Sequence, residues 1–151
     1  MSRIKIELPE HFSFYTKIPV RITDINYGGH VGNDSILSII HEARMQFLKN
    51  KNLDELNFGG FGLIMRDVAI EFKNELFYGE DVKVAVHAAD FSKIAFSIYY
   101  KIEKSNAVSN EKKIIALAKT GMVCFDYPLK KVMAIPSIIL EKFIQDINPL
   151  N

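Results

Sequence analysis

The chain has 151 residues, with 19 lysines and arginines against 18 aspartates and glutamates, and a formal net charge of +1. A nearly neutral chain has no overall field that would draw it to nucleic acid or to an anionic membrane, so neither is expected as a partner. No apolar stretch approaches the length of a membrane span, and the N-terminus lacks the apolar core of a secretion signal. We therefore expect one domain over residues 1–151, in a soluble cytoplasmic protein.

The cysteine and histidine content argues against metal and disulfide chemistry. Cys124 is the single cysteine, so no disulfide within the chain and no cysteine-based metal cluster is expected. Its apolar neighbours predict a thiol in the core rather than a nucleophile. Three of the histidines, His11, His41 and His87, are scattered without carboxylates at ligand spacing, so no metal site is expected either.

The first third of the chain predicts a strand, a polar turn and a long helix. Residues 1–9 alternate weakly and end at a proline, which is typical of a tail or an edge segment. Residues 12–23 alternate like a strand, and Pro19 places the middle of this strand at a sheet edge or a bulge. Residues 34–49 carry apolar residues at helical spacing after three residues of N-cap type. Because the apolar stripe is broad, we expect other structure to wrap this helix.

The rest of the chain predicts a run of strands and one short helix. A single helical turn is expected at residues 53–56. Alternating apolar residues predict four strands, over residues 63–73, 81–89, 94–103 and 114–127. The polar stretch 105–113 is the best candidate for a mobile hairpin loop, and Pro136 opens a short amphipathic helix over residues 137–147. One long helix set apart from consecutive strands predicts an α+β fold with an antiparallel sheet of about five strands.

The turn between Thr23 and Asn33 concentrates polar and flexible residues. It holds one carboxylate, two amides, one imidazole and three glycines: Asp24, Asn26, Asn33, His30, Gly28, Gly29 and Gly32. Glycines let a backbone approach a ligand closely, and the first amides of the following helix have no partner within the helix. This combination predicts a site for an anion or an oxyanion.

These residues resemble the hotdog-fold thioesterases of the 4-hydroxybenzoyl-CoA thioesterase type, a group that includes the acyl-CoA thioesterase associated with the Tol-Pal system. The family turn reads Asp-x-Asp-x-x-Gly-His-Val-x-Asn, and its helix ends in Glu-x-x-Arg or Glu-Ala-Arg. The matching positions here are Asp24, Asn26, Gly29, His30, Val31, Asn33 and residues 42–44. Residues 68–72, 78–80, 118–123 and Pro136 also resemble family segments.

The resemblance implies a hotdog fold, in which the antiparallel sheet wraps one long central helix. It also implies subunits that pair as a homodimer or a homotetramer. An acyl-CoA or acyl-carrier-protein thioester would bind at the subunit interface. No cofactor is implied beyond the CoA that is part of the substrate.

The chain departs from the family pattern at the residue that performs the chemistry. The resemblance places the catalytic carboxylate at the position of Asn26, and an amide can neither take a proton from water nor form an anhydride intermediate. Asn26 could instead orient water or the thioester carbonyl, or form an Asx turn. Asp24 would share a strand face with Asn26 and serve as a base, or it too could be a turn-forming residue.

Five further residues are candidates for the site. His30 is either a general base or a buried orienting histidine. Asn33 matches the helix-start amide that polarises the thioester carbonyl in the family. Glu42 is either half of an ion pair with a strand residue or a reserve general base. Arg66 and Lys93 could each hold a phosphate of CoA.

Our leading hypothesis is a cytoplasmic acyl-CoA thioesterase. Water would attack the thioester carbon with help from Asp24 or His30, and Asn26 would assist in positioning. The amide region of Asn33 would hold the oxyanion. A non-catalytic hotdog module that binds acyl-CoA or acyl carrier protein is the second hypothesis, and Asn26 motivates it. A dehydratase acting on 3-hydroxyacyl thioesters through His30 and Asp24 is the third. The acyl group, the carrier and the choice between dimer and tetramer stay open.

Overall fold

The computed structural model describes residues 2–105 and 108–147, without the side chains of residues 145–147. Its elements follow in the order β1 (Phe14–Pro19), a short 3-10 helix η1 (Ile22–Asp24), α1 (Asn33–Asn50), β2 (Gly62–Phe72), β3 (Asp81–Ala89), β4 (Ala95–Ser105), β5 (Lys112–Asp126), β6 (Lys131–Met133) and α2 (Ser137–Ile147). This order confirms the α+β class and the long helix that follows the polar turn.

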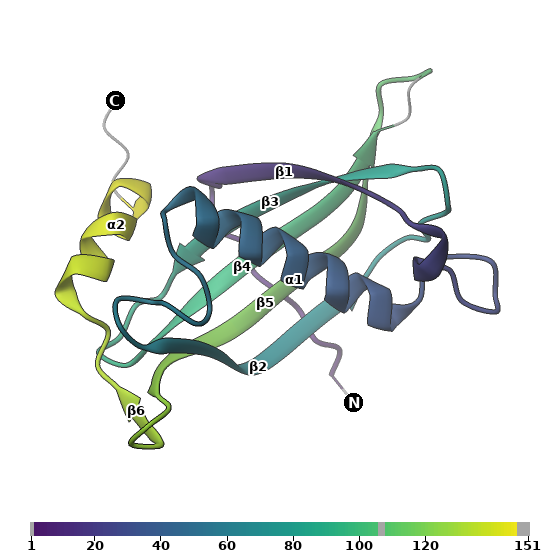
Figure 1. Cartoon of the computed structure of the whole chain (residues 1–151). Coiled ribbons are helices and arrows are strands. Elements are labelled where there is room, and N and C mark those ends of the chain that lie inside the picture. The colour runs from purple at the N-terminus through teal and green to yellow at the C-terminus, as the bar shows by residue number, and fades with distance from the viewer. Residues whose placement is uncertain (1, 106–107, 148–151) are drawn as a thin grey trace.

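The strands form one antiparallel sheet in the order β1-β3-β4-β5-β2, with the short β6 paired to β5. Strands β1 and β2 are therefore edges, although they are the first two in the chain. Pro19 closes β1 opposite Asp81, as expected for a proline at a sheet edge. Figure 1 shows α1 lying across the sheet, which is the arrangement of a hotdog fold.

Alternation along the strands divides the sheet into a helix-facing side and an outer side. Val82, Val84 and Val86 of β3 are fully buried and belong to the core cluster that also contains Ile40 and Phe47 of α1. Burial of apolar side chains of this size contributes about 1.5–3 kcal/mol each. The core therefore fixes the rotation of α1 on the sheet, and with it the position of the polar turn at the N-terminus of α1.

The outer side of the sheet carries the N-terminal segment. The backbone N–H of Ile6 donates to Glu71 Oε1 on β2, and the ring of Phe12 lies edge-on to His87 on β3. In Figure 1 this segment passes behind the sheet before the chain enters β1. Residues 2–9 form neither a helix nor a strand, so this segment is a tail that crosses the sheet.

One local prediction is wrong. Residues 53–56 form no helical turn, because the Asp54 carboxylate accepts hydrogen bonds from the backbone N–H groups of Leu56 and Asn57 at 2.8 and 2.6 Å and so folds an Asx turn. The sheet of about five strands is confirmed, with the three-residue β6 as a short sixth strand paired to the end of β5. Within the loop predicted between 105 and 113, residues 106–107 lie outside the described part of the chain. None of the helices in the described ranges has the length and apolar character needed to cross a bilayer.

Candidate active site

The polar turn folds as a small hairpin held by its own backbone. Ile25 and Val31 form an antiparallel bridge, and the N–H of Asn26 donates to the carbonyl of His30 at 2.9 Å. Gly29 takes φ of +82° at the tip, a conformation that L-residues other than glycine rarely adopt. The side chain of Asn26 accepts the N–H of Gly28 at 2.9 Å, so Asn26 forms the Asx turn that was one of its two predicted roles.

Asp24 is buried and already paired. Its carboxylate accepts the backbone N–H of Arg21 at 2.8 Å and the Arg21 guanidinium at 3.1 Å, and this hydrogen bond is the main cause that raises the pKa of Arg21. The Asp24 side chain is 3 % exposed. Its oxygens are thus committed to capping the short helix η1, which leaves them poorly placed to receive a proton from water.

His30 and Asn33 line one depression at the start of α1. This depression has a volume of about 230 Å³, and its walls are largely apolar. The apolar lining residues are Val31, Ile36, Phe72, Leu76 and Ile115, and the polar ones besides His30 and Asn33 are Lys73, Asn74 and Glu75. Apolar walls with a few polar groups are typical of the lining of a small-molecule site, and the volume lies just below the roughly 300–1,000 Å³ common for such sites.

The helix start lies at this depression, because Asn33, the first residue of α1, is among its lining residues. Gly32 is the N-cap of α1 and has no side chain to cap it, and the first bond of the helix is the one from Ile36 N–H to Gly32 O at 3.1 Å. The amides before Ile36, beginning with that of Asn33, therefore have no partner within the helix. A Cβ added at Gly32 would lie 2.6 Å from Asp34 Oδ1, so a larger residue there would displace the side chain of Asp34.

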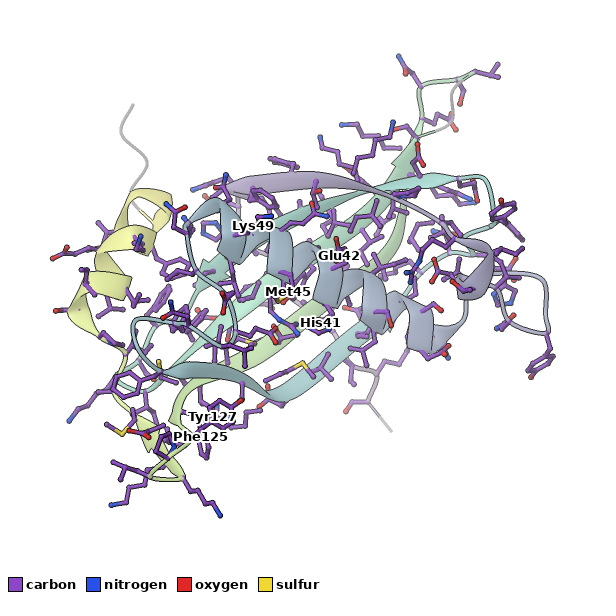
Figure 2. The ribbon with its side chains drawn as sticks, in the orientation of Figure 1. His41, Glu42, Met45, Lys49, Phe125 and Tyr127 are labelled. Atoms are coloured by element: carbon purple, nitrogen blue, oxygen red, sulfur yellow. The ribbon has the colours of Figure 1, made fainter. Side chains whose placement is uncertain are left out.

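Glu42 faces away from this depression. It is exposed on the outward side of α1, where it accepts a hydrogen bond from Gln46 at 2.9 Å; Figure 2 shows it on the same side as His41, Met45 and Lys49. The expected ion pair between Glu42 and a strand residue is therefore absent from the contacts of the described residues, because the helix turns Glu42 away from the sheet. Glu42 and Asp24 instead line a second groove of about 420 Å³ between α1 and β1.

The two predicted phosphate-binding residues lie apart from the polar turn. Lys93 follows β3, whose other end at Asp81 is beside the turn, and nine residues of strand put about 26 Å between those ends. Arg66 lies at the bulge of β2, where its guanidinium is 3.6 Å from the carboxylate of Asp67. Both side chains are exposed. Within one chain the structure thus brings together His30 and Asn33 but neither Lys93 nor Arg66.

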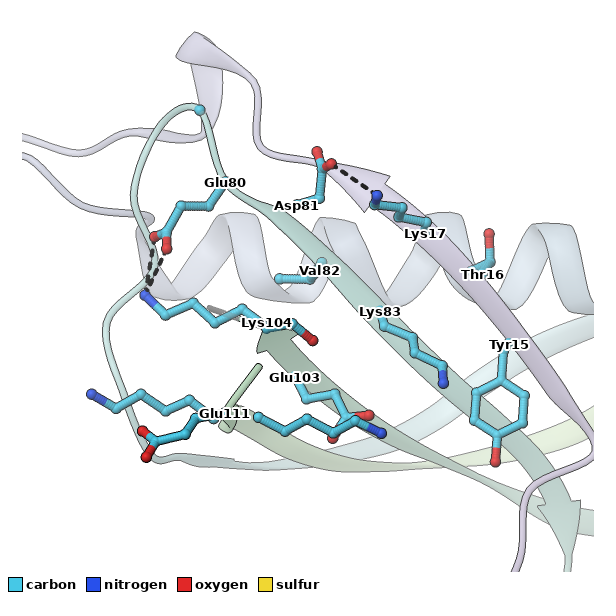
Figure 3. Close-up of a pocket in the computed structure, with 14 residues that line it drawn as sticks. Tyr15, Thr16, Lys17, Glu80, Asp81, Val82, Lys83, Glu103, Lys104 and Glu111 are labelled. Atoms are coloured by element: carbon cyan, nitrogen blue, oxygen red, sulfur yellow. Dashed lines mark hydrogen bonds and ion pairs between the residues drawn. The ribbon is translucent and has the colours of Figure 1, made fainter. Parts of the chain in front are cut away.

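A larger depression, of about 1250 Å³, contains none of the predicted residues. It opens beside β1, β3 and β4 and is lined by both lysines and carboxylates, as Figure 3 shows. Two of its ion pairs are Lys17 with Asp81 at 3.4 Å and Lys104 with Glu80 at 2.9 Å. We favour the smaller depression as the active site despite its size, because the imidazole of His30 and Asn33, the first residue of α1, line it together.

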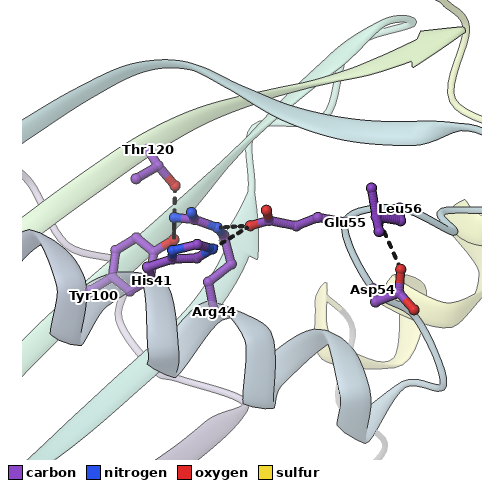
Figure 4. Close-up of polar contacts among 7 residues, drawn as sticks. All are labelled: His41, Arg44, Asp54, Glu55, Leu56, Tyr100 and Thr120. Atoms are coloured by element: carbon purple, nitrogen blue, oxygen red, sulfur yellow. Dashed lines mark hydrogen bonds and ion pairs between the residues drawn. The ribbon is translucent and has the colours of Figure 1, made fainter. Parts of the chain in front are cut away.

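A buried polar network lies under the middle of α1, and apart from the Glu-Ala-Arg motif no sequence pattern predicted it. The Arg44 guanidinium donates to Glu55 Oε1 at 2.8 Å and to the Tyr100 hydroxyl at 3.3 Å, and that hydroxyl is 2.9 Å from Thr120 Oγ1. Burial opposes the charge on Arg44, but Tyr100 and Glu55 outweigh it and raise the pKa of Arg44. Burial also raises the pKa of Tyr100. Figure 4 shows that this network ties α1 to β4, β5 and the loop after the helix.

Comparison with known proteins identifies the family. A family model described as the thioesterase-like superfamily matches residues 20–143, a range that includes the polar turn, α1 and the whole sheet from β2 to β6. The chain belongs to the thioesterase-like superfamily. A search among proteins with curated functions finds no match.

Solved structures agree with this membership. A 1,4-dihydroxy-2-naphthoyl-CoA thioesterase from Synechocystis is 25% identical, with a TM-score of 0.77 over 90% of this chain and 98% of that one. A 4-hydroxybenzoyl-CoA thioesterase from a Pseudomonas species has a TM-score of 0.76 at 12% identity, over 87% and 99% of the two chains. A predicted thioesterase from Bacillus stearothermophilus has a TM-score of 0.75 at 22% identity, over 87% and 94%.

Membership of the thioesterase-like superfamily confirms the resemblance, the hotdog fold and the reaction class predicted from the polar turn. The chain is a thioester hydrolase. The roles of the individual site residues stay predictions, and the geometry above ranks them: His30 and Asn33 share a depression, Asn26 shapes the turn, and Asp24 and Glu42 line another groove.

Proposed function

We propose that this thioesterase hydrolyses an acyl-CoA to a free acid and CoA in the depression at the start of α1. The observation that carries the proposal is that His30 and Asn33 line the same apolar-walled depression. Thioester hydrolysis needs a group that removes a proton from water and a donor that stabilises the oxyanion. His30 supplies the first and the helix-start amide at Asn33 supplies the second.

The proposed reaction uses the imidazole twice. A water oxygen bonds to the thioester carbon while its proton moves to His30, and the carbonyl electron pair moves onto the oxygen that faces the amide of Asn33. When this intermediate collapses, the C–S bond breaks and the sulfur of CoA takes the proton from His30. The products are one carboxylic acid and one CoA thiol, and no other reactant is consumed.

The walls of the depression support a substrate with an apolar acyl group or pantetheine arm. Ile36 and Leu76 are buried, and Phe72 is 46% exposed at the rim. Apolar walls also strengthen the hydrogen bond to the oxyanion by excluding water. Two of the relatives named above are thioesterases of aromatic acyl-CoAs, the naphthoyl-CoA and hydroxybenzoyl-CoA enzymes, so aromatic substrates belong among those tested first.

The test is release of free thiol from a panel of short, medium, long and aromatic acyl-CoAs by the purified chain. We expect turnover of at least one substrate that rises in proportion to enzyme concentration. Tight binding of acyl-CoAs without release of thiol from any of them would contradict the proposal, and would favour the binding module considered from the sequence.

We also propose that two copies pair through β2. This edge strand is 11 residues long and leaves one side of its backbone unpaired in the sheet order, and it exposes Met65, Val68 and Phe72 by 38, 38 and 46%. A long apolar edge strand is a template for pairing with another chain. Because Phe72 also lines the depression of His30, a partner on this edge would lie close to the bound substrate.

Sedimentation of the wild-type chain and two matched variants tests this pairing. We expect Val68→Lys to convert the oligomer to monomers because a charge cannot enter an apolar interface without cost. Val132→Lys, which changes an exposed valine on β6, should leave the mass unchanged. A wild-type chain that stays monomeric at all concentrations would contradict the proposal.

We also propose that the protein works in a reducing compartment, the cytoplasm. Cys124 is a free, fully buried thiol, and burial raises its pKa to about 11. A thiol of this kind is unreactive, and a chain with one free cysteine is typical of reducing compartments.

A further inference from the structure

We propose that Glu75 is a positioning residue for the hydrolysis, acting through His30. This inference rests on the proposed function of the same depression. His30 Nε2 lies 3.9 Å from Glu75 Oε1, and both residues line the depression with Asn33. No other ion pair of His30 is found among residues 2–105 and 108–147.

The geometry of the imidazole assigns different roles to its two nitrogens. His30 Nδ1 is 3.2 Å from the carbonyl oxygen of Val31. Because a carbonyl only accepts hydrogen bonds, Nδ1 carries the proton in the neutral ring, and Nε2 keeps its lone pair. Nε2 is therefore the nitrogen that receives a proton from water, and it is the one that faces Glu75.

The separation between His30 Nε2 and Glu75 fits an interaction that forms only after Nε2 has taken a proton. A carboxylate and an unprotonated nitrogen both accept hydrogen bonds, so they do not bond directly in the resting enzyme. At 3.9 Å a single water beside the two groups can donate one hydrogen bond to each of them. Once Nε2 takes the proton, the imidazolium faces a carboxylate of opposite charge, which stabilises the charge formed in the transition state.

Backbone contacts hold Glu75 beside His30. The N–H of Val31 donates to the carbonyl of Leu76 at 2.8 Å, so the residues that follow His30 and Glu75 are joined directly. On the other side of Glu75, the Asn74 side chain donates to the carbonyl of Ile114 at 2.6 Å. The turn between β2 and β3 is thus fixed on both sides of Glu75, while its side chain stays 65% exposed and faces the imidazole.

The charged groups around this pair leave the carboxylate of Glu75 available. Lys73 pairs with Glu71 at 3.0 Å and Lys104 pairs with Glu80 at 2.9 Å. Lys104 reaches only the backbone carbonyl of Glu75, at 3.2 Å. Asp24 is committed to Arg21. Of the carboxylates described here, Glu75 is therefore the one placed to act on His30.

The first measurement compares the wild type with Glu75→Gln on the best acyl-CoA substrate. Glutamine keeps the shape of the side chain and removes its charge. We expect kcat to fall about three- to fivefold while KM stays within about twofold, the scale for loss of a mostly exposed charge that favours a neighbouring cation. Glu75→Asp should recover part of the loss, and Glu111→Gln, which changes an exposed carboxylate away from the depression, should leave kcat unchanged.

A double-mutant cycle with His30→Ala decides whether Glu75 acts through His30. We expect Glu75→Gln to have no further effect on kcat once His30 is removed, whereas a purely structural role of Glu75 would give independent, additive losses. If the wild type hydrolyses acyl-CoAs and Glu75→Gln matches it, the role of Glu75 is refuted and the proposed function stands. If the wild type hydrolyses none of them, the proposed function and the role of Glu75 are both refuted.

Discussion

Replacing Arg44 by methionine removes the charged centre of the buried network and keeps most of the side-chain volume. The guanidinium is 6% exposed and donates to Glu55 Oε1 at 2.8 Å and to the Tyr100 hydroxyl at 3.3 Å. A hydrogen bond to a charged group contributes about 1.5–3 kcal/mol, and a neutral one about 1 kcal/mol. The loss is limited, because Tyr100 keeps its bond to Thr120.

The fate of Glu55 sets the net magnitude. Its side chain is 26% exposed and also lies 3.4 Å from His41, so water and His41 partly compensate the carboxylate when Arg44 is gone. We therefore expect the free energy of unfolding to fall by about 2 kcal/mol, below the 3–5 kcal/mol typical of a fully buried broken pair. For a chain of this length that corresponds to a melting temperature lower by about 4–8 °C.

Urea unfolding followed by circular dichroism measures this change. Arg44 lies 11 residues from Asn33 along α1, or about 17 Å, so kcat of Arg44→Met should match the wild type at a temperature where both are folded. Glu55→Gln serves as the partner variant, and the two changes should be less than additive because the residues are in contact. An Arg44→Met variant as stable as the wild type would refute the reasoning, since it would mean that desolvation of the guanidinium cancels its hydrogen bonds.

Two further predictions concern the backbone and the alkaline range. Gly59→Ala should lower the free energy of unfolding by more than Gly29→Ala. Both glycines have positive φ, and an alanine in this left-handed conformation costs about 1–2 kcal/mol. A Cβ at Gly59 would also lie 2.7 Å from Ile139, whereas one at Gly29 meets no atom within 4 Å. Equal losses in urea unfolding would contradict this. Burial, with a hydrogen bond to Asp90, raises the pKa of Tyr99 from 10.0 to about 12, so the folded state keeps a proton that the unfolded state loses and stability should fall as pH rises from 10 to 12. Tyr99→Phe should flatten this fall, and an unchanged slope would argue against the assignment.

The sequence predicted most of the fold because its signals are local. Alternating apolar residues placed β3 at residues 81–89, the bounds that the structure has, and the proline at 136 marked the start of α2, whose Ile139 N–H donates to the Pro136 carbonyl at 3.0 Å. The three residues of β6 are too few to show alternation. The strand order, with β1 and β2 on opposite edges, depends on long-range pairing that no local pattern encodes.

The candidate site was predictable only where its parts are close in the sequence. His30 and Asn33 lie in one turn, and their residue types predicted an oxyanion site there. Glu75 is 45 residues further along, and the bond from Val31 N–H to the Leu76 carbonyl brings it beside His30. Glu42 was difficult for a different reason: the broad apolar stripe of α1 leaves its rotation ambiguous by sequence, and packing on the sheet turns Glu42 outward.

The most direct test of the central claim is the kcat of His30→Ala on the best acyl-CoA substrate, measured beside His41→Ala, which removes an exposed histidine from the other side of α1. Affinity is measured in parallel by calorimetry with a non-hydrolysable thioether analogue of the same substrate. We predict that kcat of His30→Ala falls by at least about 100-fold, as for loss of a general base, with affinity nearly unchanged and His41→Ala close to the wild type. Full turnover by His30→Ala would contradict the account and return the search for the base to Asp24 and Glu42.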